Sequence, residues 1–382
     1  MQSMKLKDCC TIIAGQSPES KYYNTDGIGL PFFQGKADFG ELYPTIRVYC
    51  SQPTKIADKD DILLSVRAPV GPTNLAPCQV CIGRGLTAIR PSSSLNLKYV
   101  LFFFRYFEAQ LQQKGTGTTF KAITQDVVKN LEIPVPPLDE QERIVARIEE
   151  LFSQLDSGVE TLRKTKQQLA VYRQAVLKEA FDSVSEYGNA NIESLCQSIV
   201  DCPHSTPKWS EDGYLCLRTT NFKRGRLDLS EKNYVTKEIF DIRNTRLVPL
   251  PGDVLYSREG AILGIACIIP KNTYVCLGQR MMLLRPGKKL NNRYLMHFLN
   301  SPVLTTFVAS ITGGSASPHV NVGDIKSFMI PCPDIEIQKG IVLEIDSKLS
   351  VCDSIEQTVD TALQQAEAMR QSILKQAFEG EA

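Results

Sequence analysis

The side chains best suited to specific chemistry are hydrogen-bonding groups in segments predicted to be loops. Arg and Lys suit the guanine edge, Asn and Gln suit the adenine edge, and loop His and Thr can touch base edges or phosphates. The N-terminal half offers Gln34, Lys36, Arg67, Arg84 and Lys121. The C-terminal half offers His204, Thr206, Lys208, Arg218, Asn221, Lys223, Arg258, Gln279, Arg280 and His319. Residue type alone leaves base contact, phosphate contact and ordinary surface charge open for each of them.

Motifs for enzyme chemistry are incomplete in this sequence. Cys78-Gln79-Val80-Cys81 supplies two of the four ligands of a structural zinc site. Gly83-Arg84-Gly85-Leu86-Thr87-Ala88 has the spacing of a dinucleotide-binding loop, but Pro91-Ser92-Ser93-Ser94 follows where a helix is required. His297 lies in an apolar run and is expected to be packed. The sequence therefore predicts structural thiols, no metal site, no catalytic residues and no cofactor on this chain.

Charge is strongly segregated along a chain whose net charge is only +1. Residues 1–137 carry 15 Lys/Arg and 11 Asp/Glu, and residues 190–332 carry 17 and 11. Residues 138–189 carry 7 Lys/Arg and 10 Asp/Glu, and residues 333–382 carry 4 and 10. The two basic stretches could bind a polyanion such as nucleic acid, or they could be ordinary solvated surface.

The elements that must position these side chains begin with a strand-rich stretch over residues 1–137. Short strands are expected at 80–82 and 86–89, and a buried strand followed by a polar tip at 61–67. An apolar helix is expected from Leu97 to near Gln113, followed by a flexible Gly/Thr-rich loop at 115–119. Phe120, beside Lys121, could be a wedge or a loop anchor. A last strand or extended exit is expected at 131–136. The pattern indicates an α+β fold.

A long helix is predicted over residues 138–185, with Asp139 and Glu142 forming a capping-box-like start. Its apolar seam recurs every seven residues, with further members three residues later. The seam consists of Ile148, Leu151, Leu155, Leu162, Leu169, Tyr172 and Val176. Such a stripe requires a second long helix to cover it.

The chain itself supplies the second helix, over residues 333–380. Arg173–Phe181 and Arg370–Phe378 are identical at six of nine positions, at an offset of 197 residues. The repeated seam consists of Ile345, Cys352, Ile355, Val359, Ala366, Met369 and Ile373. Since each helix follows a globular domain, the two are expected to pack as an antiparallel coiled coil with one domain at each end.

The globular stretches, 1–137 and 190–332, are duplicated as well. Asp61–Ser65 matches Asp253–Ser257, and Ile133–Pro136 matches Ile330–Pro333. The loop Tyr22–Thr25 has no visible counterpart in the second copy. Because the frame is shared while the loops diverge, the two copies are expected to bind two different targets.

The chain resembles the specificity (S) subunit of type I restriction-modification enzymes over nearly its whole length. The resemblance is carried by Pro134–Gln141 at the helix entry, by the twin helix tails, by the strand-turn pairs Asp61–Gly71 and Asp253–Gly264, and by Asp201–Pro207. It implies a non-catalytic DNA reader with two target-recognition domains, 1–137 and 190–332. Each domain would read one half of an asymmetric, two-part DNA site.

The resemblance also implies partners that this chain needs for activity. The helical pair would set the gap between the half-sites and dock two modification subunits, which bring S-adenosylmethionine and methylate adenine. A restriction subunit can join them to form an ATP-dependent nuclease, so S-adenosylmethionine, ATP and Mg are expected on partner subunits, in the cytoplasm and away from any membrane. The alternative is a coiled-coil protein-interaction scaffold without sequence-specific DNA binding. An enzyme acting on nucleic acid is the least favoured hypothesis.

Overall fold

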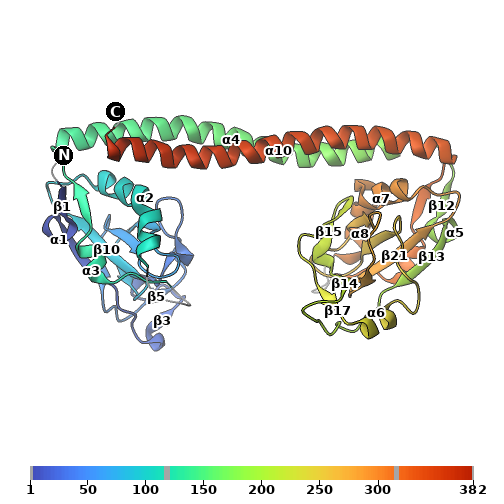
Figure 1. The fold of residues 1–382 in the computed structure, drawn as a ribbon, viewed down its shortest axis with the longest axis horizontal. Coiled ribbons are helices and arrows are strands. Elements are labelled where there is room, and N and C mark those ends of the chain that lie inside the picture. The colour runs from blue at the N-terminus through green and yellow to red at the C-terminus, as the bar shows by residue number, and fades with distance from the viewer. Residues whose placement is uncertain (1–2, 116–120, 314–317, 381–382) are drawn as a thin grey trace. The chain divides into compact units, whose positions relative to one another are not determined.

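The computed structural model describes residues 3–115, 121–313 and 318–380, and it divides into two compact units. Unit 1 comprises Met1–Leu162 with Thr361–Ala382, and unit 2 comprises Arg163–Asp360. Figure 1 shows that each unit is a strand-rich domain covered on one side by stretches of two long helices. The expected loop at 115–119 and Phe120 fall largely outside the described residues.

Unit 1 is built around an antiparallel sheet in the order β2-β10-β7-β8. These strands are Cys10–Ala14, Leu86–Pro91, Ile62–Ser65 and Thr73–Leu75. A second sheet has the order β3-β5-β4-β9-β6, formed by Tyr23–Asn24, Tyr49–Cys50, Leu30–Phe33, Val80–Ile82 and Ile56–Ala57. In this sheet β4 and β9 are parallel. A short ribbon joins β1 (Ser3–Lys5) to β11 (Glu132–Pro134) and brings the two ends of the domain together.

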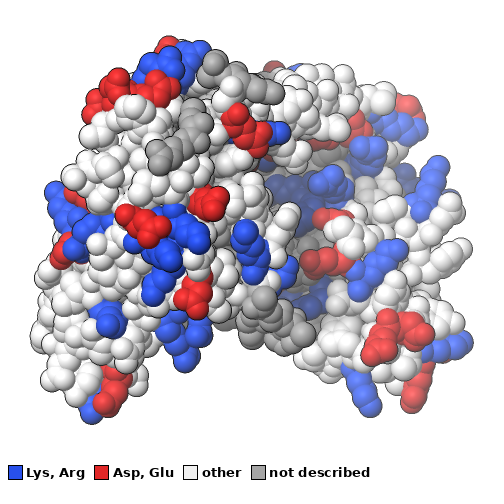
Figure 2. Space-filling view, turned by 60° about the vertical axis from the view of Figure 1, so that its left-hand side comes forward, with Lys and Arg blue, Asp and Glu red and all other residues white. Residues whose placement is uncertain are grey.

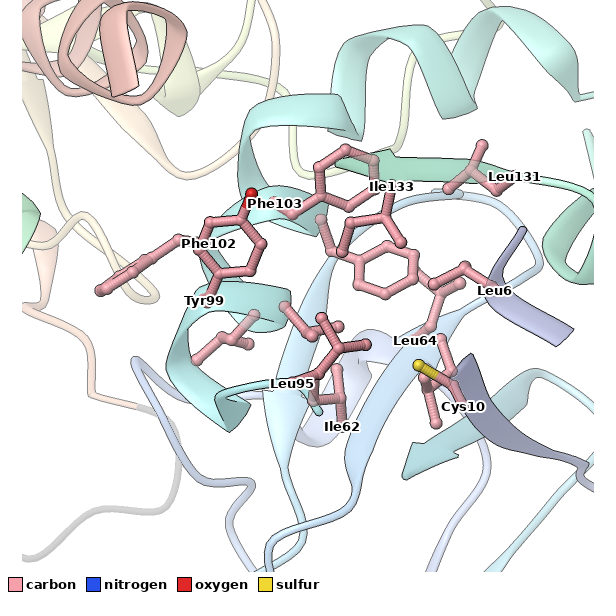
Figure 3. Packing of buried hydrophobic residues seen from close by; sticks show 14 of the residues in the cluster. Leu6, Cys10, Ile62, Leu64, Leu95, Tyr99, Phe102, Phe103, Leu131 and Ile133 are labelled. Atoms are coloured by element: carbon pink, nitrogen blue, oxygen red, sulfur yellow. The ribbon is translucent and has the colours of Figure 1, made fainter. Parts of the chain in front are cut away.

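The core of unit 1 lies between its first sheet and the helix α2 (Leu97–Lys114). The side chain of Asn96 caps this helix by accepting hydrogen bonds from the backbone amides of Lys98 and Tyr99. Figure 3 shows Tyr99, Phe102 and Phe103 among apolar side chains from the sheet and the chain ends. The short helices α1 (Leu6–Cys9) and α3 (Gln125–Lys129) complete the domain, together with the 3₁₀ turns η1 (Ser20–Tyr22) and η2 (Lys36–Asp38).

Unit 2 repeats this topology with different loops. Its main sheet has the order β13-β21-β18-β19, formed by Cys196–Asp201, Met281–Pro286, Val254–Ser257 and Ala266–Ile268. A smaller sheet, β17-β14-β20, consists of Tyr234–Val235, Tyr214–Leu217 and Cys276–Leu277. The remaining ribbons are β12 (Asn189–Asn191) with β22 (Met329–Pro331) and β15 (Phe222–Lys223) with β16 (Arg226–Leu227). The predicted duplication of the frame is therefore confirmed.

One ion pair to a buried aspartate marks the shared frame in both units. Arg90 binds Asp61 at 2.7 Å in unit 1, and Arg285 binds Asp253 at 2.7 Å in unit 2. The units differ where α2 of unit 1 is replaced by two helices, because Pro302 begins a new helix after α7 (Asn292–Asn300). The other helices of unit 2 are α5 (Ile192–Leu195), α6 (Lys237–Arg243), α7 (Asn292–Asn300), α8 (Pro302–Thr312), α9 (Val322–Lys326) and the 3₁₀ turn η3 (Thr219–Asn221).

The two long helices are α4 (Leu138–Asp182) and α10 (Ile335–Glu379), each of 45 residues. In unit 1 Arg370 of α10 pairs with Asp156 of α4. In unit 2 Arg173 pairs with Asp353 at 2.7 Å, and Lys166 pairs with Asp360 at 2.6 Å. Residue numbers rise on one helix as they fall on the other, so the predicted antiparallel packing is confirmed within each unit.

The expected capping box at the start of α4 is wrong. The amides of Glu140 and Gln141 both bond to the carbonyl of Pro137, so the helix begins at Leu138 and Asp139 already lies inside it. The anchor is instead the buried side chain of Gln141. Its amide accepts from the Asn96 N–H at 2.8 Å and donates to the carbonyls of Ser94 and Pro136 at 3.0 and 2.8 Å.

Gln338 repeats this anchor at the start of α10. It accepts from the N–H of Asn291 at 2.8 Å and donates to the carbonyls of Lys289 and Pro333 at 2.9 and 2.8 Å. The two helix starts look different in sequence, yet the same buried amide joins each helix to its own domain.

The seven-residue positions of the seam are mostly buried, but several of the intermediate positions are not. The buried members are Ile148, Leu169, Val176, Ile345, Cys352, Val359 and Ala366. Leu151, Leu155, Leu162 and Ile373 are half-buried. Tyr172, Ile355 and Met369 are exposed, so their assignment to the seam is wrong.

The second buried position lies four residues after the first, as in the pairs Ile148–Phe152 and Leu374–Phe378. The globular domain packs against this side of the helices. Phe152 contacts Phe102, and Phe378 contacts Tyr99. A four-residue step broadens the apolar stripe so that it covers both the partner helix and the domain.

No single helix among the described residues is both long enough and apolar enough to cross a membrane. The consecutive helices α7 and α8 reach that length and apolar character only when they are taken together, and they are bent by 52° relative to each other.

Candidate nucleic-acid interface

Two of the candidate residues of unit 1, Arg67 and Arg84, lie where three strands of its main sheet begin or end. We call this the strand-end edge of unit 1, and it comprises residues 14–15, 66–67, 84–86 and 122–123. The amide of Gly15 bonds to the Leu86 carbonyl, and the amide of Val66 bonds to the Gly85 carbonyl, each at 3.0 Å. An isolated bridge joins Arg67 to Ala122.

A pocket of about 190 Å³ opens at this edge, between the side chains of Arg67 and Arg84. The other lining residues are Ala14, Gly15, Val66, Leu86, Thr87, Ala122, Ile123 and Gln125. The described lining contains no carboxylate, and neither arginine forms an ion pair with a described residue. Two exposed guanidinium groups beside apolar walls suit a ligand that presents hydrogen-bond acceptors or negative charge.

Gln34 lies beside this pocket, because its backbone follows β4, which pairs with β9. The amide of Gly83 bonds to the Phe33 carbonyl at 2.8 Å, which brings Gln34 next to Arg84. Lys36 in η2 and Lys121 are exposed but do not line the pocket. The structure thus gathers Gln34, Arg67 and Arg84, and leaves the two lysines on the surrounding surface.

Unit 2 has the same edge, held by the same backbone bonds. We define the strand-end edge of unit 2 as residues 201–202, 258–259, 279–281 and 319–320. The amide of Cys202 bonds to the Met281 carbonyl at 3.2 Å, and the amide of Arg258 bonds to the Arg280 carbonyl at 3.0 Å. An isolated β-bridge between backbone groups joins Glu259 to His319, as another joins Arg67 to Ala122 in unit 1. These matches make Arg67 equivalent to Glu259, and Arg84 equivalent to Gln279.

Arg258 is not the exposed contact that its position in the sequence suggests. Its side chain is only 7% exposed and binds Asp201 at 3.0 Å and Glu259 at 2.8 Å. It also donates to the Val320 carbonyl at 3.3 Å. Because a buried guanidinium needs partners, Arg258 holds two carboxylates at the edge instead of reaching outward. Nε2 of His204 lies 2.9 Å from Asp201 on the exposed side of this cluster.

Asn221 is likewise structural. It is buried and accepts from the Arg218 N–H at 2.8 Å, while its amide nitrogen donates to the carbonyls of Asp228 and Glu231 at 3.0 and 2.9 Å. These bonds use its hydrogen-bonding groups to shape the η3 turn. Arg218 itself is exposed and lies over the ring of Trp209, 5.7 Å from its centroid. Trp209, which the sequence interpretation passed over, adds an aromatic surface beside this cation.

A second residue that the sequence interpretation missed is Arg243, at the end of α6. Its buried guanidinium donates to the carbonyls of Leu277 and Gly278 at 2.6 Å each, and to those of Pro203 and Ser205 at 3.2 Å each. It therefore ties the loop that carries His204 and Thr206 to the strand end before Gln279. No short motif marks such a residue, since its four partners lie at least 34 residues away.

Gln279 completes this arrangement in unit 2. It accepts a bond from the Thr206 hydroxyl at 3.3 Å and donates to the carbonyl of His204. Arg280 and His319 are exposed nearby, whereas Lys208 and Lys223 are exposed on the surrounding loops. Figure 2 shows Lys and Arg side chains spread over the surface of the domains, with acidic side chains between them.

The expectation that His297 is packed is confirmed. His297 is buried, and its Nε2 lies 3.0 Å from Asp346 of α10. Cys78 and Cys81 are free thiols, half-buried and buried respectively. Burial raises the pKa of the Cys81 thiol, so this cysteine is held in its neutral form.

Curated relatives of the chain are named as specificity subunits of type I restriction enzymes. One relative is a Methanocaldococcus jannaschii chain that is named as the type I restriction enzyme MjaX specificity subunit. This chain is 41% identical to it over 167 residues, which cover 44% of this chain and 38% of the relative. It is 28% identical over 314 residues to the type I restriction enzyme EcoBI specificity subunit of Escherichia coli, covering 73% and 65%. The chain thus spans less than two thirds of the length of these relatives.

One solved structure shares the fold over the full chain. It is described as "Structural basis underlying complex assembly and conformational transition of the type I R-M system", and it covers 100% of this chain and 98% of its own. The TM-score is 0.73 and the identity is 19%, which is a likeness of fold.

The family model for the type I restriction modification DNA specificity domain matches residues 1–169 and 201–365. These two matched segments contain one strand-end edge each and together cover most of the chain. The chain therefore belongs to the family of type I restriction modification DNA specificity domains.

Proposed function

We propose that this chain is the non-catalytic DNA-specificity subunit of a type I restriction-modification system. Each globular domain binds one half of an asymmetric, two-part DNA site. The observation that carries the proposal is the pair of strand-end edges, which share a backbone frame and carry different side chains. Two copies of one DNA-binding scaffold with different side chains at their strand-end edges suit a DNA site whose two halves differ in sequence.

The long helices support the second part of the proposal, the assembly of the complex. A continuous helix of 45 residues is about 68 Å long at 1.5 Å per residue. The helical pair sets the gap between the half-sites and docks two modification subunits, which methylate adenine. These partners supply the S-adenosylmethionine, and a restriction subunit supplies the ATP- and Mg-dependent nuclease, all in the cytoplasm.

The proposal is tested by purifying the chain with its modification subunits and selecting from random double-stranded DNA. We expect enrichment of one motif with two short specific halves and an unspecific gap. Mapping methylated adenine in the source genome should give the same two halves. A chain that binds DNA with no sequence preference at any salt concentration would support the protein-interaction scaffold instead, which the family match does not favour.

A further inference from the structure

Arg67 and Glu259 occupy the same position in two copies of one scaffold. Each lies two residues after the buried serine that ends the central strand, Ser65 in β7 and Ser257 in β18. Each is bridged to the segment that precedes the last small helix of its domain, at Ala122 and His319. Two copies that dock on DNA in the same way therefore turn these two positions toward the same part of their half-sites.

The two side chains have opposite hydrogen-bonding character. A guanidinium only donates hydrogen bonds, and an ionised carboxylate only accepts them. One carboxylate oxygen of Glu259 binds Arg258 at 2.8 Å, yet the side chain remains 27% exposed and keeps acceptor capacity toward solvent. The neighbouring position changes as well, from Arg84 in unit 1 to Gln279 in unit 2. At these two positions unit 1 therefore presents only donors, whereas unit 2 presents a carboxylate, held by the buried Arg258, and an amide. The exposed guanidinium of Arg280 lies beside them in the edge of unit 2.

This difference decides between base and phosphate contact. A carboxylate at a phosphate would be repelled, so Glu259 is unsuited to backbone contact. The equivalent position in unit 1 then faces base edges as well, and the pocket between Arg67 and Arg84 provides a recess for one. Arginine pairs with O6 and N7 of guanine, while Glu accepts from the N4 amino group of cytosine.

We infer that positions 67 and 259 are equivalent specificity-determining positions: Arg67 reads a guanine in one half-site, and Glu259 reads a cytosine in the other. This inference rests on the proposed function and assigns residues to it. Arg258 acts as a positioning residue, because it holds the Glu259 carboxylate in place without reaching the DNA.

The test uses matched substitutions to glutamine in the intact chain, purified with its modification subunits. Arg67→Gln and Glu259→Gln each place an amide, which suits adenine, at an equivalent position. Binding selections from random double-stranded DNA are sequenced for the wild type and both variants. Lys7→Gln is the control, since this exposed lysine of α1 lies outside the strand-end edge.

We expect Arg67→Gln to lower the preference for guanine at one position by roughly 5- to 100-fold, with a shift toward adenine and with the other half-site unchanged. Glu259→Gln should lower the preference for cytosine in the other half-site by a similar factor, again with a shift toward adenine. Lys7→Gln should return the wild-type motif. Thermal melting of each variant establishes that it is folded before the selection is interpreted.

Two results would overturn the inference while leaving the proposed function standing. One is an unchanged motif in Arg67→Gln with weaker binding to every sequence, which would make Arg67 a phosphate contact. The other is an unchanged motif in Glu259→Gln, which would remove this position from the DNA. A wild-type complex that selects no two-part motif would instead overturn the proposed function, and this inference with it.

Discussion

At the scale of single residues, the buried cation Arg243 holds the edge of unit 2 together. Four backbone carbonyls surround its guanidinium, two from the loop 203–205 and two from the strand end 277–278. Hydrogen bonds to charged groups contribute about 1.5–3 kcal/mol each, and buried carbonyls left without donors carry a further penalty. The loop that presents His204 and Thr206 therefore depends on a residue that itself lies away from the surface.

Arg243→Met should lower the free energy of unfolding by roughly 3–5 kcal/mol, because it leaves four carbonyls without this donor. The only tryptophan, Trp209, lies in unit 2, so its fluorescence during urea denaturation reports the loss. Lys237→Met is the control on the same helix, because Lys237 forms only an exposed pair with Asp241 and its loss should leave the free energy of unfolding nearly unchanged. Equal effects of the two substitutions would contradict the role of Arg243.

Tyr99 gives a second prediction at this scale, through pH. Burial raises the pKa of its hydroxyl from 10.0 to about 12, and the hydroxyl donates to the Pro134 carbonyl at 3.1 Å. Between these pH values the folded chain binds a proton that the unfolded chain has lost, so stability falls as pH rises from 10 toward 12. Tyr99→Phe should flatten this fall, measured by circular dichroism of urea unfolding at pH 9 to 12. An equally steep fall in the variant would refute the assignment.

At the scale of elements, the two helix starts are fastened by the same buried amide. Gln141→Leu or Gln338→Leu removes three hydrogen bonds to backbone groups and leaves one amide and two carbonyls without this partner. Each substitution should cost roughly 2–4 kcal/mol. Trp209 fluorescence reports the loss for Gln338→Leu, and far-ultraviolet circular dichroism reports it for Gln141→Leu. Replacing the adjacent exposed Glu142 by Gln should leave the stability unchanged within about 0.5 kcal/mol.

The sequence predicts that Ile148 and Tyr172 both lie in the seam, but they differ in burial and therefore in expected phenotype. Ile148 packs in the core of unit 1 with Leu6 and Phe102, so Ile148→Asp should destabilise the domain by more than about 3 kcal/mol. Tyr172 is 49% exposed and, with Val171, borders an open surface depression of about 460 Å³ whose lining residues all belong to α4. Tyr172→Asp should therefore leave the melting temperature unchanged while it weakens capture of the modification subunits in a pull-down. A normal pull-down with this variant would show that these subunits dock elsewhere.

Sequence periodicity predicts the long helices and their pairing because a seven-residue repeat is a local property of each helix. It does not predict Phe152 and Phe378, whose burial depends on contact with aromatic residues of α2. The same limit applies at the edge of unit 2. Arg258 is drawn inward by Asp201, which lies 57 residues earlier, and nothing in the sequence near Arg258 reveals that partner. Local patterns thus anticipate elements, whereas the roles of single charges depend on tertiary partners.

At the scale of the whole molecule, charge divides the chain by function. The globular stretches 1–137 and 190–332 have net charges of +4 and +6, and the helical stretches 138–189 and 333–382 have −3 and −6. Acidic helices add nothing to the attraction of DNA, so they suit contact with protein partners. Affinity for DNA should come from exposed cations of the domains, through release of counterions from the phosphates.

Lys208 and Lys223 test this division, because they are exposed on the domain of unit 2 but lie outside its strand-end edge. If each contacts a phosphate, then replacing both by Gln should reduce the slope of log affinity against log salt by roughly two. The selected DNA sequence should stay the same, since phosphates carry no sequence information. Lys375→Gln on α10 removes a charge from the acidic stretch and should leave the slope unchanged. A motif altered by the double variant, with its salt slope intact, would mean that these lysines read bases and that the boundary of the strand-end edge is drawn too narrowly.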